Sequence, residues 1–169
     1  MYLGDWVGAI LKPLPHRLIT LLIWCIIFPI PAVSKNCSVD QIDLRGSFGQ
    51  VRFDVYLAAT SKSREKGLMY ITDFSQRKAM LFVYPEPQRV SFWMKNTLIP
   101  LDILFADGKG EIVRIHHNAK PHDKTLIYGG DNVQFVLEIN AGLSKRFEFH
   151  IGAQMLHPMI SDNANSECK

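Results

Sequence analysis

The chain lacks an excess of charge of either sign, and it lacks a long unbroken apolar run. Its 19 Lys and Arg residues are nearly balanced by 16 Asp and Glu residues, which leaves a formal net charge of +3. A nucleic-acid-binding surface would need basic residues gathered on one face, and this balance does not indicate one. No segment has the roughly 18 consecutive apolar residues of a membrane span. The 169 residues, 47% of them hydrophobic, are sufficient for one small globular domain.

Cysteine is also scarce, and none lies in the middle of the chain. Cys25 lies in an apolar N-terminal segment, whereas Cys37 and Cys168 flank the rest of the sequence. In an oxidising compartment these two could form a disulfide, which would stabilise the fold by about 4 kcal/mol through the unfolded state. The alternative is a pair of free thiols near frayed ends, and the sequence leaves both alternatives open.

Residues 1–34 are typical of a secretory signal peptide. Basic residues precede an apolar run from Leu18 to Ile30, and small residues follow at Ala32 and Ser34. Small residues at these positions suit signal peptidase, so we expect cleavage after residue 34 and a periplasmic or extracellular protein. An uncleaved membrane anchor is the alternative, because the leader is long and Asp5 precedes its basic residues. We expect one domain over residues 35–160 and a disordered tail over 161–169.

Apolar and polar residues alternate along much of the remaining chain, which is typical of half-buried β-strands. Alternating segments occur at residues 51–57, 90–94, 101–105, 113–115 and 133–139, with a strand buried on both faces at 80–83. Glycine-containing turns are expected at 46–49 and 107–110, and short helices at about 61–69 and 141–146. The sequence therefore predicts a mainly β (α+β) fold, a single antiparallel β-barrel or sandwich-like domain with one or two short helices. One hydrophobic core is expected from Met80, Phe82, Phe92, Met94, Ile103, Phe105, Phe135 and Leu137.

Four segments, taken in order, resemble motifs of a bacterial and archaeal family. They are REKGLM at 64–69, MLFV at 80–83, FWMKNTLIPLDI at 92–103 and VLEINAG at 136–142. The matching family is the domain of unknown function 192, also called uncharacterised protein family 0127. The resemblance covers roughly residues 42–153, with Ala79 standing where many relatives have Gly. It implies a compact β-rich fold with a shared site, and it implies no particular reaction; relatives are often exported.

The polar residues of the third segment predict a ligand-binding site. Trp93 and Lys95 alternate with two residues expected in the core, so both should face solvent or a cleft. An outward Trp offers a flat face to a sugar ring or a base, and Asn96, Thr97 and Asp102 could supply directed hydrogen bonds. The alternative is that these three polar residues form a turn before the following proline and cap backbone groups.

Charged residues stand out in otherwise apolar motif segments, among them Arg64, Glu65 and Glu138. A partly buried charge needs a partner, so we expect Arg64 to pair with Asp102 or Glu138. Arg64, Asp102 and Glu138 also suggest a second hypothesis, an envelope hydrolase. In this hypothesis Asp102 and Glu138 form an acid–base pair and Arg64 orients the substrate.

Other chemistries find little support in the sequence. A serine-nucleophile elbow, a phosphate loop and a dinucleotide fingerprint do not occur. His116 and His117 are neighbours on a predicted strand and should point to opposite faces, so with His122 they do not make a metal site, and we expect no metal or cofactor.

We therefore expect an exported, non-catalytic binding module for a small polar ligand such as a carbohydrate, with the hydrolase as the alternative. We expect a monomer that binds neither nucleic acid nor, after signal cleavage, membrane. The candidate ligand-binding residues are Arg64, Trp93, Lys95, Asn96, Thr97, Asp102 and Glu138.

Overall fold

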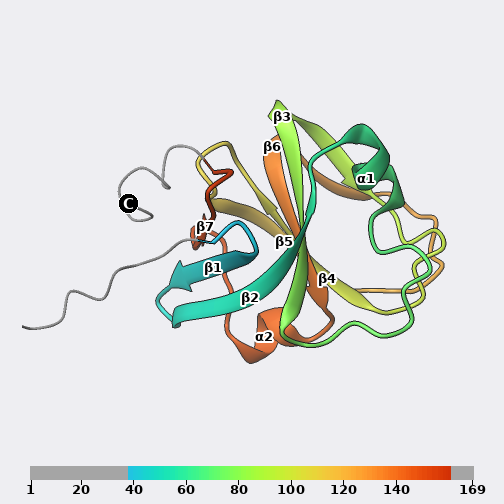
Figure 1. Ribbon diagram of the computed structural model, residues 1–169, viewed down its shortest axis with the longest axis horizontal. Helices are drawn as coiled ribbons and strands as arrows, with labels where there is room; N and C mark the ends of the chain where they lie inside the picture. Colours follow the sequence, from blue (N-terminus) through green and yellow to red (C-terminus); the bar gives the residue numbers. More distant parts are fainter. Residues whose placement is uncertain (1–37, 161–169) are drawn as a thin grey trace, which may run out of the picture. The chain divides into compact units, whose positions relative to one another are not determined.

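The computed structural model describes residues 38–160 (Figure 1). The expected signal peptide, the Cys37 and Cys168 thiols and the expected tail lie outside the described residues. Within the described part, two helices accompany a set of strands. The strands are β1 (Gln41–Gly46), β2 (Gly49–Ala58), β3 (Lys78–Phe92), β4 (Leu101–Ala106), β5 (Ile112–Ala119), β6 (Ile127–Asn140) and β7 (Gln154–Leu156), and the helices are α1 (Ser61–Lys66) and α2 (Leu143–Arg146).

The strands form one curled sheet in the order β5-β4-β6-β3-β2-β1-β7 (Figure 1). Its ends approach each other, because Glu111 forms a β-bridge with Gln154 and the amide of Ile112 donates to the carbonyl of Ala153 over 2.8 Å. The sheet is thus a half-barrel, and the predicted β-rich class with two short helices is confirmed. The pairing is mixed rather than wholly antiparallel, since β2 and β3 run parallel and are joined by a crossover that contains α1.

The α1 helix begins and ends where its local sequence dictates. Thr60 is the N-cap: its hydroxyl accepts from the amide of Ser63 over 3.1 Å, and the Ser63 hydroxyl accepts from the Thr60 amide over 2.9 Å. Gly67 ends the helix with φ at +47°, a left-handed value that glycine tolerates. The helix therefore stops at Lys66, three residues before the predicted end near Met69, and leaves residues 67–70 as a turn.

Hydrophobic side chains form two clusters on opposite faces of the sheet, so the prediction of one core is wrong. The α2-side cluster contains Phe135 and Leu137, whereas the α1-side cluster contains Phe82 and Phe105. Met80 is only partly buried, against the α1-side cluster. The physical reason is that both faces of the sheet are covered. Every residue of β4 is buried, so its side chains alternate between the two clusters. The sheet is therefore packed on both faces in its middle.

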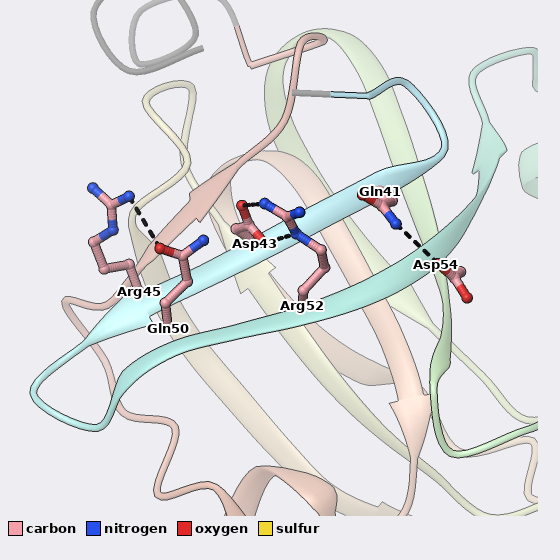
Figure 2. A network of polar contacts seen from close by, with 6 residues as sticks. All are labelled: Gln41, Asp43, Arg45, Gln50, Arg52 and Asp54. Carbon is pink, nitrogen blue, oxygen red and sulfur yellow. Dashed lines mark hydrogen bonds and ion pairs between the residues drawn. The ribbon is translucent and has the colours of Figure 1, made fainter. Parts of the chain in front are cut away.

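The β1–β2 hairpin carries a row of polar pairs (Figure 2). Arg52 binds Asp43 with both ends of its guanidinium, Nε to Oδ1 at 2.6 Å and Nη2 to Oδ2 at 2.7 Å. Asp43 and Arg52 are direct cross-strand partners, as are the other two pairs in the row. Those pairs are Gln41 with Asp54 and Arg45 with Gln50, each at 3.3 Å.

None of the helices found between residues 38 and 160 combines the length and the apolar character needed to cross a membrane.

Candidate functional site

A pocket of about 610 Å³ opens on the α1 side of the sheet. Its walls are α1 with the turn that follows, the middle and end of β3, and the loop after β3, while β6 contributes one residue. The pocket therefore brings together residues of all four motif segments described above, with one residue each from the second and the fourth. Residues on which the site depends are Arg64, Met69, Tyr84, Trp93, Asn96 and Glu138.

Glu138 is the most unusual residue of this pocket. It lies on β6 between Met80 of β3 and Ile103 of β4, its direct cross-strand partners, and is only 5% exposed. Its Oε2 atom has no hydrogen-bond partner among the described residues. Burial removes the carboxyl from water and raises its pKa from 4.5 to about 8. At neutral pH the side chain is therefore mostly a protonated carboxyl that can donate a hydrogen bond.

Arg64 joins α1 to β3 and lines the same pocket as Glu138. Its Nη1 atom donates to the carbonyl oxygens of Ala59 at 2.8 Å and Val83 at 2.9 Å. The guanidinium also lies over the ring of Tyr84, 5.0 Å from the ring centroid. The partners of Arg64 are thus uncharged groups, rather than the carboxylates of Asp102 or Glu138 that the sequence suggested as its partners. Its positive charge remains available to the pocket.

The pKa of Tyr84 depends on two ionisable neighbours, Arg64 and Glu138. Burial raises the pKa of its hydroxyl, the nearby Arg64 charge works in the opposite direction, and Glu138 raises the pKa further. These influences place Tyr84 within electrostatic reach of both Arg64 and Glu138. Sequence analysis did not single out Tyr84, although it lies two residues after Phe82 on one strand face, and both residues line the pocket.

Trp93 forms an open wall of the pocket. The residue is 44% exposed while Phe92 and Met94 are buried, so the predicted alternation is confirmed here. Lys95, the next residue on the same side, places its Nζ atom 5.2 Å from the centroid of the Trp93 ring. The indole therefore offers its surface to the pocket next to a positive charge.

Asn96 shapes the pocket through its backbone. Its φ is +59°, and its carbonyl accepts from the amide of Tyr70, whose φ is +65°, over 2.9 Å. The side-chain amide of Asn96 reaches the sulfur of Met69 at 3.8 Å. Two non-glycine residues with left-handed φ values are thus joined across the pocket, and such backbone strain often occurs at functional sites. Thr97 is buried and lines the same wall.

Asp102 does not line the pocket. It is fully buried, and its Oδ1 accepts from the Asn118 amide at 2.8 Å while its Oδ2 accepts from the Ser144 amide at 2.9 Å and from the Ser144 hydroxyl at 2.6 Å. Asp102 pairs with Ile139 on β6, and the next residue along β4 pairs with Glu138. Neighbours on a strand point to opposite faces, so the two carboxyl groups lie on opposite sides of the sheet.

The structure thus brings together six of the seven sequence candidates and leaves Asp102 apart, as a hydrogen-bonded support for α2. The expected acid–base pair does not meet in one cleft. Sequence analysis also did not select Lys62, Lys66, Met69 and Tyr70, which line the pocket from α1 and its turn. Their signal was their position within or beside the first motif segment. Between residues 38 and 160, no three His, Cys, Asp or Glu side chains gather in an arrangement that could hold a metal.

Comparison with known proteins identifies relatives of this domain. Residues 44–157 match the DUF192 family, described as Uncharacterized ACR. A crystal structure of a protein of unknown function from Novosphingobium aromaticivorans is 35% identical, with a TM-score of 0.67, over 69% of this chain and 83% of the other. A crystal structure of a "putative transcription regulator" from Sinorhizobium meliloti is 36% identical, with a TM-score of 0.70, over 73% of this chain and 97% of the other. No curated protein matches the chain. The family match covers most of the chain and agrees with the motifs in its sequence, and the chain belongs to the DUF192 family.

Proposed function

We propose that the pocket between α1 and β3 binds a small polar ligand, such as a carbohydrate, and performs no reaction on it. The observation that carries this proposal is the Oε2 atom of Glu138, a buried oxygen without a hydrogen-bond partner among the described residues, in a side chain that lines the pocket. Leaving a buried polar atom unpaired costs about 1–3 kcal/mol. A ligand that supplies the missing hydrogen bond would recover this cost on binding.

The size and lining of the pocket support the same proposal. Its volume of about 610 Å³ lies within the range of small-molecule sites. The exposed Trp93 ring provides a flat apolar surface, while Asn96 and Glu138 provide directed polar groups. This combination of one aromatic wall with a few polar groups suits a sugar ring, which presents apolar C–H faces and hydroxyl edges.

The position of Asp102 favours binding over the hydrolase alternative. General acid–base hydrolysis uses two carboxyl groups that face one cleft. Asp102 lies on the opposite face of the sheet from Glu138, and both of its oxygens are occupied by hydrogen bonds. The other carboxylate among the described lining residues, Glu65, is exposed on α1. We further propose that binding occurs in the periplasm or outside the cell, a proposal that rests on residues 1–34 alone.

A fluorescence titration would test the proposal. The full chain has three tryptophans, Trp6, Trp24 and Trp93, so a chain with Trp6→Phe and Trp24→Phe reports on Trp93 alone. We expect neutral or acidic monosaccharides, added to millimolar concentration, to change its emission in a saturable way. In this chain, a further Trp93→Phe change should abolish the change in emission. Trp93→Ala should weaken the binding that calorimetry measures. If no monosaccharide gives saturable binding by either method, the carbohydrate proposal fails.

A further inference from the structure

We propose that the ligand of this pocket is an acid, a small molecule with a carboxylate or phosphate group whose anionic oxygen accepts a hydrogen bond from Glu138. This inference rests on the proposed function and narrows it from a polar ligand to an anionic one. It depends on two independent features of the pocket, which are the charge of its lining and the buried carboxyl among its lining residues, whose Oε2 atom has no partner among the described residues.

The lining of the pocket is more positive than the chain as a whole. Four cationic residues line it, against the two acidic residues Glu65 and Glu138. The lining therefore carries a formal charge of at least +2, whereas the entire chain carries +3. The cationic residues are Lys62, Arg64, Lys66 and Lys95. Positive charge concentrated along one concave surface attracts anions and raises their local concentration.

Two of these positive charges, those of Arg64 and Lys95, contact uncharged groups. Arg64 donates to two backbone carbonyls and lies over the Tyr84 ring, and Lys95 lies over the Trp93 ring. A carbonyl or an aromatic ring orients a cation but carries no net charge to neutralise it. An anionic ligand would supply the missing negative charge and could accept hydrogen bonds from the same groups.

The protonation of Glu138 makes it a suitable partner for an anion. Burial raises its pKa to about 8, so near neutral pH the carboxyl keeps its proton and can donate to an anionic oxygen. The charged and titratable groups that share the lining are the four cations, Glu65, Tyr70 and Tyr84, while β4 presents Ile103. An anion beside Glu138 would favour the protonated form further, so binding and protonation would reinforce each other. Raising the pH above 8 should therefore weaken binding.

A matched set of probes tests the inference. Glucose, glucuronate and glucose 6-phosphate share one ring and differ at carbon 6, where they carry a neutral hydroxyl, a carboxylate or a phosphate. With the Trp93 reporter chain we expect at least one of the two acids to bind about tenfold more tightly than glucose, because hydrogen bonds to charged groups are the stronger ones. If glucuronate binds more tightly than glucose 6-phosphate, the pocket prefers a carboxylate, and the reverse order indicates a phosphate. Glucose binding as tightly as both acids would overturn the inference and leave the proposed function intact, whereas no binding by any probe would overturn both.

Two charge variants with the same chemical change provide the control. Lys95→Gln removes a cation of the pocket, and Lys145→Gln removes an exposed cation on α2, on the other side of the sheet. We expect Lys95→Gln to weaken binding of the tighter acid up to about fivefold, and by a larger factor than it weakens binding of glucose. Lys145→Gln should change neither. Equal weakening by both variants would indicate a general effect of net charge and would contradict the inference.

Variants of Glu138 separate donation of a hydrogen bond from charge. Glu138→Gln keeps a donor that cannot ionise, so acid binding should persist and lose its dependence on pH between 7 and 9. Glu138→Leu removes the donor and should weaken acid binding about tenfold or more, while circular dichroism and melting show that the domain remains folded. A wild-type affinity for the acids that rises as the pH is raised through 8 would overturn the inference, since it would mean that ionised Glu138 favours the ligand.

Discussion

At the scale of single residues, the Glu138 carboxyl is unfavourable for the stability of the strand, and we propose that it is favourable for ligand binding. The residue lies between two apolar cross-strand partners, and no ion pair with a described residue compensates its ionised form in this buried environment. An apolar residue at this position would fit the strand better, as Ile103 does next to it. The conflict between the apolar surroundings and the carboxyl is what distinguishes this position from the rest of β6, where the inward residues are hydrophobic.

The pKa of Glu138 predicts a pH-dependent stability. Because the folded pKa of about 8 lies above the ordinary value of 4.5, the folded state binds more protons between these values. The contribution of Glu138 to the free energy of unfolding is therefore full below pH 4.5 and is lost as the pH rises through 8. Glu138→Gln should leave stability nearly unchanged at pH 4.5 and raise it by a few kcal/mol at pH 9. Urea denaturation at both pH values measures this, and an equal effect at both would contradict the assigned pKa.

Two aromatic truncations should separate a core residue from a pocket residue. Phe82 is 1% exposed and packs against Phe92 with ring centroids 4.9 Å apart, so Phe82→Ala should cost about 3–5 kcal/mol. Trp93 is 44% exposed, and Trp93→Ala should cost about 1 kcal/mol. Denaturant unfolding of both variants decides this. A Trp93→Ala protein as unstable as Phe82→Ala would mean that the indole supports the fold rather than a ligand.

Sequence patterning identified part of the site at this scale. The outward direction of Trp93 follows from strand alternation, which is a local property. The separation of Asp102 from Glu138 does not follow from either segment alone, because it depends on the register between β4 and β6. A shift of one residue in that register would exchange the faces, and sequence motifs contain no information on register.

At the scale of secondary-structure elements, Asp102 fastens α2 to the sheet. Its two oxygens hold the amide of Asn118 on β5 and both polar groups of Ser144 on α2. The Ser144 hydroxyl continues to His117, whose Nδ1 atom lies 2.7 Å away. The helix has only four residues and would not be stable alone, so this buried carboxylate determines where it sits.

Removing the Asp102 carboxylate should therefore destabilise the domain. Asp102→Ala removes the acceptor of the Asn118 amide and of the buried Ser144 amide and hydroxyl, and should lower the free energy of unfolding by about 3 kcal/mol. The comparison is Asp43→Ala, which removes the carboxylate of a pair whose arginine is 47% exposed and should cost roughly 1 kcal/mol. Chemical denaturation gives both values, and amide hydrogen exchange in residues 143–146 gives the local effect. Equal costs for the two variants would contradict the role assigned to Asp102.

Element-level prediction succeeded where signals were local. The Asp107–Gly110 turn joins the two strands that were expected to flank it. The turn at Gly46–Gly49 also forms as expected, although β1, the strand before it, was not predicted. The parallel pairing of β2 with β3 was missed because alternation has the same period in parallel and antiparallel strands. The single core was missed for a related reason: alternation identifies two faces of a strand but does not say that both faces of the middle strands are covered.

At the scale of the whole described domain, its two ends meet at His157. This fully buried ring donates from Nε2 to the carbonyl of Val39 at 3.0 Å and accepts from the Met159 amide at Nδ1, also at 3.0 Å. The bonding requires neutral imidazole, since both nitrogens would be donors in the charged form. Burial lowers the pKa of His157 below its ordinary value of 6.5, so the folded domain favours that neutral form.

Acid should loosen this junction. Because the folded pKa of His157 is depressed, the unfolded state binds more protons just below pH 6.5, and stability falls as the pH is lowered through that window. His157→Gln offers a donor and an acceptor without titrating, so it should remove this loss. Thermal melting of both proteins between pH 7 and 5 measures the difference. The Glu138 contribution has the opposite sign, so the Glu138→Gln background isolates the histidine; a pH slope unchanged by His157→Gln there would contradict the prediction.

The crossover between β2 and β3 has a consequence for how a ligand enters and leaves. Its helix, α1, has six residues and buries none of them, yet it forms one wall of the pocket. Segments with few buried contacts open locally at far lower free energy than the sheet beneath them. We expect amide exchange in residues 61–70 to be fast in the free protein and to slow on binding. We then expect the opening of this short segment to limit how fast the bound ligand dissociates.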